Sequence, residues 1–147
     1  MNKTTVKFKK LDERAQMPHY GTEFAAGADL YACLDAPLTI AKGATEFVHT
    51  GIAMEIPTGL VGLVYARSGL ACKKGLAPAN KVGVVDSDYR GEIMVILLNT
   101  NPAGKESYTI HPGDKIAQGE FPFPYKADFK EISSEEFDKL TTSRGEN

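Results

Sequence analysis

Apolar and polar residues alternate in several short segments of this chain. Val6 and Phe8 alternate with lysines, and the same period of two recurs over 28–33 and 52–57. That period is typical of β-strands with one buried face. Two further segments, 60–66 and 93–98, are almost continuously apolar but short, as expected for strands buried on both faces. We therefore expect these two segments at the centre of the fold.

Glycine and proline interrupt the apolar segments at intervals of about eight to twelve residues, a spacing typical of a sandwich, barrel or jelly roll. The chain has 14 glycines and 8 prolines, and no internal repeat is evident. The pattern therefore predicts an all-β fold. The expected turns are at Gly43, Gly51, 57–59, Gly75, 102–104 and 112–113.

Helix signals are few. Ser133 and Glu136 form a potential capping box, and Phe137 and Leu140 have helical spacing, so a short helix is expected over 133–140. A second short helix could begin at Ser68. Residues 141–147 contain no apolar side chain and are expected to form a polar, mobile tail. The predicted organisation is one domain over 1–140, followed by the start of an arm over 141–147.

Composition narrows the possible functions. A chain of 147 residues that is 42% hydrophobic can bury a stable core without disulfide or metal cross-links. A net charge of -2 argues against binding to a nucleic-acid backbone, and the chain has no apolar run of membrane-spanning length. Its two cysteines form no CxxC pair or disulfide framework, which favours a reducing, cytoplasmic setting.

The segment 80–92 carries the most informative chemistry. Asp86, Asp88 and Tyr89 lie between the apolar stretches 82–85 and 93–98, which predicts a hairpin with these side chains at its tip. A solvated turn would account for Asp88 and Gly91, because Asp and Gly suit tight turns. It would not require Asn80, Asp86 and Tyr89 beside one another.

A second group follows the apolar segment 60–66. Arg67, Ser68 and Gly69 could combine a guanidinium, a hydroxyl and exposed backbone N–H groups around phosphate oxygens. An ordinary serine N-cap beside a surface arginine is the alternative. Asp29, set among small residues, must face solvent or find a partner, and Gln118 could point its amide at a ligand.

Metal-centred and covalent chemistry are not indicated by residue spacing. The three histidines are isolated and lack an HxH or HExxH pattern, so a structural or hydrolytic zinc site is not expected. The serines lack a GxSxG elbow, and Cys72 has no evident base nearby in the sequence.

Taken in order, four segments resemble the first four of the five motifs of the trimeric dUTP pyrophosphatase (dUTPase) family. This resemblance spans nearly the whole chain and implies a distorted β jelly roll with active sites between the subunits of a homotrimer. It also implies hydrolysis of dUTP to dUMP and pyrophosphate, which limits uracil incorporation into DNA and supplies dUMP for dTMP synthesis. The matching segments are 26–30, 66–71, 80–91 and 113–118.

The resemblance assigns roles around the third motif. Asp86 matches the carboxylate that orients and deprotonates a water for attack on the α-phosphorus and meets the sugar 3′-hydroxyl. Tyr89 would lie against the deoxyribose where a ribose 2′-hydroxyl would need space. Asn80 and the backbone of Gly83 would hydrogen-bond uracil, and a narrow pocket would reject thymine and cytosine.

The other motifs would bind the triphosphate. The resemblance implies that a neighbouring subunit supplies Arg67, Ser68 and Gly69, with Gln118 assisting. It implies Mg²⁺ bound to the triphosphate, with Asp29 reaching its shell through water, as Mg²⁺ commonly keeps water ligands. Lys115 stands where many members carry arginine, and a lysine loses the bidentate fork.

The fifth motif begins at Arg144, which would help to bind substrate, and Gly145. It should continue into a glycine-rich, aromatic arm that closes over the substrate, whereas this sequence ends at Asn147. We expect that the arm continues beyond the given residues, and otherwise that the protein works without a complete lid.

Two other functions suit the same fold. A dCTP deaminase would need a carboxylate beside the pyrimidine, but the corresponding position, near Ile96, is apolar. A noncatalytic nucleotide-binding or regulatory protein could share the architecture, but Asp86 and Tyr89 are both present.

Overall fold

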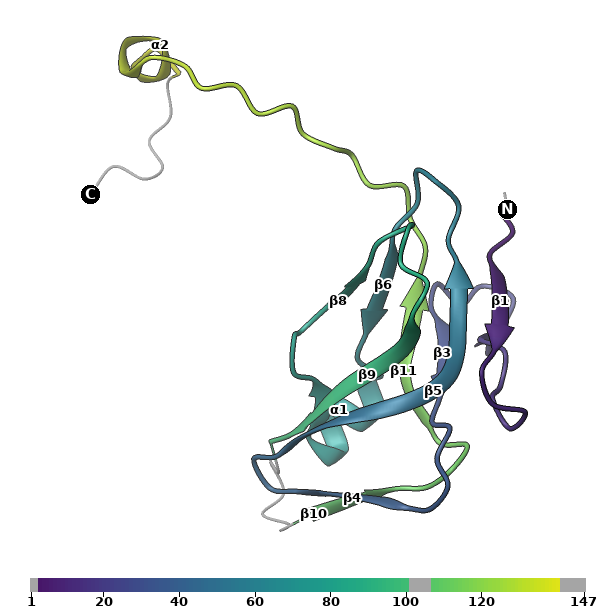
Figure 1. Ribbon diagram of the computed structural model, residues 1–147. Helices are drawn as coiled ribbons and strands as arrows, with labels where there is room; N and C mark the ends of the chain where they lie inside the picture. Colours follow the sequence, from purple (N-terminus) through teal and green to yellow (C-terminus); the bar gives the residue numbers. More distant parts are fainter. Residues whose placement is uncertain (1–2, 101–106, 141–147) are drawn as a thin grey trace.

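The computed structural model describes residues 3–100 and 107–140, and within them the chain is mostly β-structure (Figure 1). This confirms the all-β prediction. The described elements, in chain order, are β1 (Lys7–Lys10), β2 (His19–Tyr20), β3 (Ala28–Tyr31), β4 (Leu38–Ala41), β5 (Thr45–Glu55), β6 (Gly62–Tyr65), α1 (Ser68–Lys74), β7 (Leu76–Pro78), β8 (Gly83–Val85), β9 (Glu92–Asn99), β10 (Ser107–Ile110), β11 (Lys115–Glu120) and α2 (Ser134–Asp138).

The strands form a four-stranded sheet in the order β1-β5-β9-β7, a five-stranded sheet in the order β2-β3-β11-β6-β8, and the pair β10-β4. All these pairings are antiparallel. Both continuously apolar segments form interior strands, β6 and β9, as predicted. Consecutive strands often belong to different sheets, so the chain crosses repeatedly between the two layers, as in a jelly roll.

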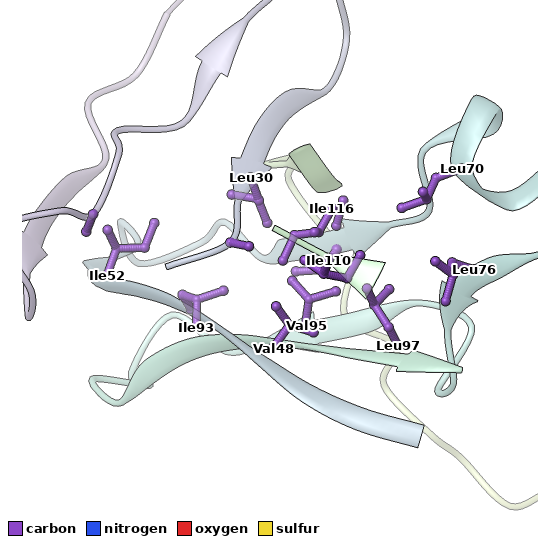
Figure 2. Close-up of a cluster of buried hydrophobic side chains, with 14 of the residues drawn as sticks. Leu30, Val48, Ile52, Leu70, Leu76, Ile93, Val95, Leu97, Ile110 and Ile116 are labelled. Carbon is purple, nitrogen blue, oxygen red and sulfur yellow. The ribbon is translucent and has the colours of Figure 1, made fainter. Parts of the chain in front are cut away.

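The hydrophobic core lies between the sheets and joins them. Leu30 and Ile116 come from the five-stranded sheet, while Val48, Val95 and Leu97 come from the four-stranded sheet (Figure 2). Each of these five side chains is at most 2% exposed. Burial of this kind contributes roughly 1.5–3 kcal/mol for each Val, Leu or Ile side chain, so the core fixes how the two sheets, and the loops they carry, are placed.

Burial of β6 and β9 on both faces was expected, and for this single chain that expectation is wrong. Along β9 the burial alternates, with Ile93, Val95 and Leu97 in the core. Met94 is 39% exposed and Ile96 is half-buried, both on the opposite face. The continuous apolar pattern therefore marks a strand whose second face is apolar yet uncovered in the isolated chain.

The expected hairpin between 82–85 and 93–98 is also wrong. The strand β8 pairs with β6 in the five-stranded sheet, whereas β9 pairs with β5 and β7 in the other sheet. The six residues between β8 and β9 are enough to carry the chain from one layer to the other. Asp86 and Tyr89 consequently lie on a connection between sheets.

The two predicted helices are present. The Ser133 side chain accepts a hydrogen bond from the Glu136 backbone N at 3.1 Å, which confirms Ser133 as the N-cap of α2. The N-cap of α1 is Arg67 and has no side-chain cap, so Ser68 is the first helical residue and not an ordinary N-cap. The predicted tail over 141–147 lies outside the described residues. No helix within the described part of the chain is long and apolar enough to cross a membrane.

The chain leaves the sheets after β11 and leads to α2 well away from them (Figure 1). Along this segment Phe123, Tyr125 and Phe129 are each at least 75% exposed. Aromatic side chains gain much free energy from burial, and apolar side chains exposed together often mark a surface that contacts another molecule.

Gly51 has a backbone requirement that can be tested. Its φ is +69°, and an added Cβ would lie 2.9 Å from both the Ala15 Cβ and the Cys33 Sγ. We expect Gly51→Ala to lower the free energy of unfolding by about 2–4 kcal/mol, the sum of a left-handed backbone cost and overpacking. Gly43 is the matched control, because its φ is +76° with nothing within 4 Å of an added Cβ.

Urea unfolding at one protein concentration measures both glycine variants. Gly43→Ala should lose about 1 kcal/mol, the backbone cost alone. An equal loss for the two variants would show that Ala15 and Cys33 do not confine Gly51.

Candidate active site

Four of the predicted site residues surround one cavity of about 180 Å³. Asn80, Gly83, Asp86 and Tyr89 all line it, which brings together the residues predicted to bind the base and sugar and to act on water. The remaining wall is mainly apolar and comes from both sheets. It consists of Val64, Pro78, Val84, Val85, Ile93, Met94, Val95 and Ile96.

Local hydrogen bonds shape the loop that carries Asn80. The Ala79 backbone N donates to the Ile96 carbonyl at 2.8 Å, which ties the loop to β9. The Lys81 N then donates to the Pro78 carbonyl at 3.0 Å, closing a tight turn. Lys81 has a φ of +67°, a backbone conformation that is uncommon for a residue other than glycine. Backbone strain of this kind often marks functional loops.

Because Gly83 has no side chain, the backbone of β8 can lie close to Val64 and Asn80. An added Cβ would lie 3.1 Å from the Val64 Cβ and 3.5 Å from the Asn80 Nδ2. A Cβ would therefore press on Val64 of β6 and would be in ordinary contact with the asparagine amide. The glycine leaves room for backbone groups and the Asn80 side chain to face the same cavity.

Tyr89 is held by two bonds within its own turn. Its backbone N donates to the Asp86 carbonyl at 3.1 Å, and its hydroxyl donates to the Glu92 carbonyl at 2.9 Å. The phenol also lies over Gly91, where an added Cβ would come within 2.5 Å of the hydroxyl oxygen. Tyr89 is 43% exposed, so part of the residue is open to a ligand.

The predicted phosphate-binding residues lie elsewhere in the same chain. Arg67 and Lys115 line a second cavity of about 340 Å³, and no residue lines both this cavity and the one around Asp86. Ser68 and Gly69, at the start of α1, are exposed. The structure therefore groups the base-binding and phosphate-binding residues into two sets and does not join the sets within one chain.

Asp29 and Gln118 sit beside the phosphate-binding set. Asp29 lies 3.3 Å from the Lys115 Nζ and 3.8 Å from the Arg67 Nε, so the carboxylate has the charged partners that its position requires. The Gln118 amide donates to the Ala66 carbonyl at 2.9 Å, directly before Arg67. Its interaction is thus with the backbone that leads into α1.

Two cations at the second cavity suit a phosphate-bearing ligand, and one carboxylate, Asp114, lines that cavity with them. Asp86 supplies an exposed carboxylate at one cavity, while Arg67 and Lys115 supply cations at the other. The described residues contain no group of three or more His, Cys, Asp or Glu side chains able to hold a metal ion. Asp29 remains a carboxylate that could meet a hydrated ion through water, a donor set that fits Mg²⁺ carried by phosphates.

Several contributors to the site were not predicted from the sequence. Val84 and Met94 line the first cavity, where the sequence indicated only strand residues, whereas Ile96 lies at the position compared with a deaminase carboxylate. The ion pairs of Asp29 join residues far apart in the chain. No local motif predicts such pairs, since each depends on how β3, β6 and β11 lie side by side.

Comparison with known proteins identifies the family to which this chain belongs. The dUTPase family model matches residues 13–123. The deoxyuridine 5′-triphosphate nucleotidohydrolase of Rickettsia felis is 43% identical over 147 residues, covering 99% of this chain and 94% of that protein. The protein of the same name from Desulfitobacterium hafniense is 49% identical over 117 residues, covering 79% of this chain and 76% of that protein.

A solved structure shares the fold. A mutant dUTPase from phage phi11 of S. aureus, described for its coordination of a structural Mg(II) ion, is 25% identical with a TM-score of 0.78. The match covers 91% of this chain and 100% of that chain.

Proposed function

The chain belongs to the dUTPase family, and on that premise we propose that it hydrolyses dUTP to dUMP and pyrophosphate with Asp86 as the general base. The observation that carries the assignment of roles is the single cavity shared by Asn80, Gly83, Asp86 and Tyr89. It supports a site in which base recognition, sugar recognition and water activation occur side by side. The domain that bears it is proposed to span residues 1–140.

Asp86 would take a proton from a water molecule while the water oxygen attacks the α-phosphorus and pyrophosphate leaves. Asp86 and Tyr89 belong to the same turn, in which the Tyr89 N donates to the Asp86 carbonyl. This supports the role, because the tyrosine ring would hold the deoxyribose beside the carboxylate. A carboxylate that orients and deprotonates water in this way contributes by positioning and by proton transfer.

Asn80 and the Gly83 backbone would recognise uracil. An amide side chain and backbone groups can match the donor and acceptor pattern of the uracil edge, and a mismatched base would leave them unpaired. The apolar wall of Val84, Met94 and Ile96 supports close packing against the base.

The triphosphate would be bound by Arg67, Ser68 and Gly69, with help from Gln118. Arg67 supports this role through a planar guanidinium that can hold phosphate oxygens in pairs. Asp29 would contact Mg²⁺ through water. Mg²⁺ bound to the triphosphate would offset the negative charge that develops on the leaving pyrophosphate. Arg144, the remaining proposed ligand, lies outside the described residues.

A homotrimer with shared sites would join the two sets of residues. Arg67 of one subunit would then face the cavity that contains Asp86 of its neighbour. The separation of the two cavities within one chain supports this arrangement. The exposed aromatic residues of 121–140 supply surface for such contacts. Two free cysteines are in keeping with a cytoplasmic enzyme.

The two alternative functions are less well supported. A deaminase would need a carboxylate where Ile96 lines the cavity. A noncatalytic binding protein would not require Asp86 and Tyr89 to meet at the same cavity, although it could share every other feature. Measuring the products formed from dUTP and dCTP distinguishes both alternatives from dUTP hydrolysis.

The test is turnover of nucleotides by the purified protein with Mg²⁺. We expect pyrophosphate release from dUTP, with kcat/KM at least about 100-fold lower for UTP, dCTP and dTTP, because a polar site rejects a mismatched ligand strongly. Addition of a chelator should abolish turnover. Ammonia release from dCTP would favour the deaminase, and binding of dUTP without hydrolysis would favour the regulatory protein.

A further inference from the structure

The strand β5 departs from regular pairing directly behind the candidate active site. His49 lies opposite Met94, but the next registered pair is Ala53 with Glu92, so three residues of β5 face the single residue Ile93. Such a bulge twists a strand and re-aims the residues around it. It occurs where β9 begins, immediately after the turn that holds Asp86 and Tyr89.

Two side chains of β5 bind the two residues of β9 at the bulge. The buried Thr50 hydroxyl donates to the Ile93 carbonyl. The His49 Nδ1 lies 2.5 Å from Glu92 Oε2 and 3.1 Å from Oε1. An ionised carboxylate only accepts, so Nδ1 carries the proton and donates. The Glu92 side chain is 21% exposed and the His49 side chain 56%, so the pair is partly shielded from water.

The backbone of the bulge is fixed from its other side. The Cys33 N donates to the His49 carbonyl at 2.7 Å, and the Leu11 N donates to the Gly51 carbonyl at 2.7 Å. His49 is therefore a firm anchor for Glu92, because its own main chain is bonded to a third segment.

Glu92 links this anchor to the ligand-facing residues. Its backbone carbonyl accepts the hydrogen bond of the Tyr89 hydroxyl at 2.9 Å, and the Tyr89 N in turn donates to the Asp86 carbonyl at 3.1 Å. A shift of Glu92 would move the acceptor that holds the phenol. The Tyr89 main chain is also held by Arg90, whose guanidinium donates to the Tyr89 carbonyl at 3.0 Å, but the phenol hydroxyl is held by its hydrogen bond to Glu92.

We propose that the His49–Glu92 pair is a positioning device for Tyr89, and through it for recognition of the sugar. Neither residue contacts the ligand-facing cavity in the described chain. Both act by holding the Glu92 carbonyl where the Tyr89 hydroxyl can reach it. The link to sugar recognition rests on the proposed function, whereas the link to Tyr89 rests on the geometry alone.

The kinetic test compares His49→Ala, Glu92→Ala and the double variant. Each single variant should lower kcat/KM for dUTP about tenfold, since small displacements of positioning groups cost this much or more. Turnover of UTP should change less than about twofold, so the dUTP/UTP preference falls. The double variant should lose no more than either single variant, because one interaction is removed in all three.

Two further variants separate positioning from general damage. In His49→Asn the amide nitrogen stands close to the original Nδ1 and can still donate, so most of the dUTP/UTP preference should return. Glu55→Ala removes an exposed carboxylate from the same sheet and should leave the preference unchanged. A drop in melting temperature with an unchanged preference would show that the pair only stabilises the fold.

A measurement on the free protein tests the geometry without turnover. The ¹³C-labelled ring signal of Tyr89, assigned with Tyr89→Phe, should shift in His49→Ala and Glu92→Ala but not in Glu55→Ala. An unshifted Tyr89 signal in both pair variants would overturn the proposal. If the signal shifts but the wild-type protein hydrolyses no dUTP, the positioning of Tyr89 stands and the proposed function fails.

Discussion

Replacement of Asp86 by asparagine is expected to lower kcat for dUTP by at least about 100-fold, because a positioned general base usually contributes that factor or more. Asparagine keeps the shape of the side chain and can still bond to the sugar, but it cannot take the proton of the attacking water. Affinity for a nonhydrolysable dUTP analogue should therefore remain close to that of the wild-type protein. Steady-state kinetics and titration calorimetry measure the two quantities.

Asp88 provides the matched control for Asp86. It is a second exposed carboxylate on the same connection between β8 and β9, but it does not line the cavity. Asp88→Asn removes the same charge at nearly the same place in the chain and should retain most of the activity. A kcat for Asp86→Asn above about a tenth of the wild-type value would contradict the general-base role. Equal losses in both variants would assign the effect to local charge.

The residues that could be predicted from the sequence are those whose local pattern is sufficient. Ser133 and Glu136 are three residues apart, so their capping contact depends only on the helix between them. Alternation identifies Ala28 and Leu30 as the buried residues of β3, whereas residues 50–54 of β5 are all buried. The third motif likewise places Asn80, Asp86 and Tyr89 within ten residues, and they do meet at one cavity.

Strand pairing is where the local pattern was insufficient. The sequence around Asp86 predicts a turn between two strands, which is correct, but it does not reveal whether those strands pair with each other. Here β8 completes one sheet beside β6, and β9 lies in the other between β5 and β7. Which strands pair depends on how much apolar surface each sheet can bury, and this is a property of the whole fold.

Long-range contacts had no sequence signal at all. His49 and Glu92 are 43 residues apart, and their contact depends on a bulge in β5 that allows the strand to bend. The apolar outer residues of β9 gave a signal that was misread, because Met94 and Ile96 suggest burial on both faces while one chain covers only one. Apolar residues on such a face are better understood as surface reserved for another chain or a ligand.

The second large effect is expected when two inactive variants are combined in one assembly. Arg67→Ala should lose at least about 100-fold in kcat/KM, because removal of one charged donor to a reacting group commonly costs this much. Asp86→Asn is similarly inactive. If each site uses Arg67 of one subunit and Asp86 of its neighbour, a trimer that contains both variants has one site with both residues intact.

The number of intact sites in a mixed trimer does not depend on the ratio of the two variants within it. A mixed trimer contains either two subunits with Arg67→Ala or one. In both cases just one of its three subunit boundaries brings an intact Arg67 together with an intact Asp86. Co-expression with two different tags and purification on both should therefore yield trimers with about one third of wild-type activity. Homotrimers of either variant, prepared in the same way, are the controls.

Mixed assemblies also distinguish shared sites from sites built within one chain. In the second case every site would contain one substitution, and the mixed trimers would be as inactive as their parents. Sedimentation equilibrium must first show that both variants form trimers, since loss of Arg67 also removes its hydrogen bond to the Lys115 carbonyl. Recovery of activity in verified mixed trimers would then assign the two separate cavities of this chain to one site at the subunit boundary.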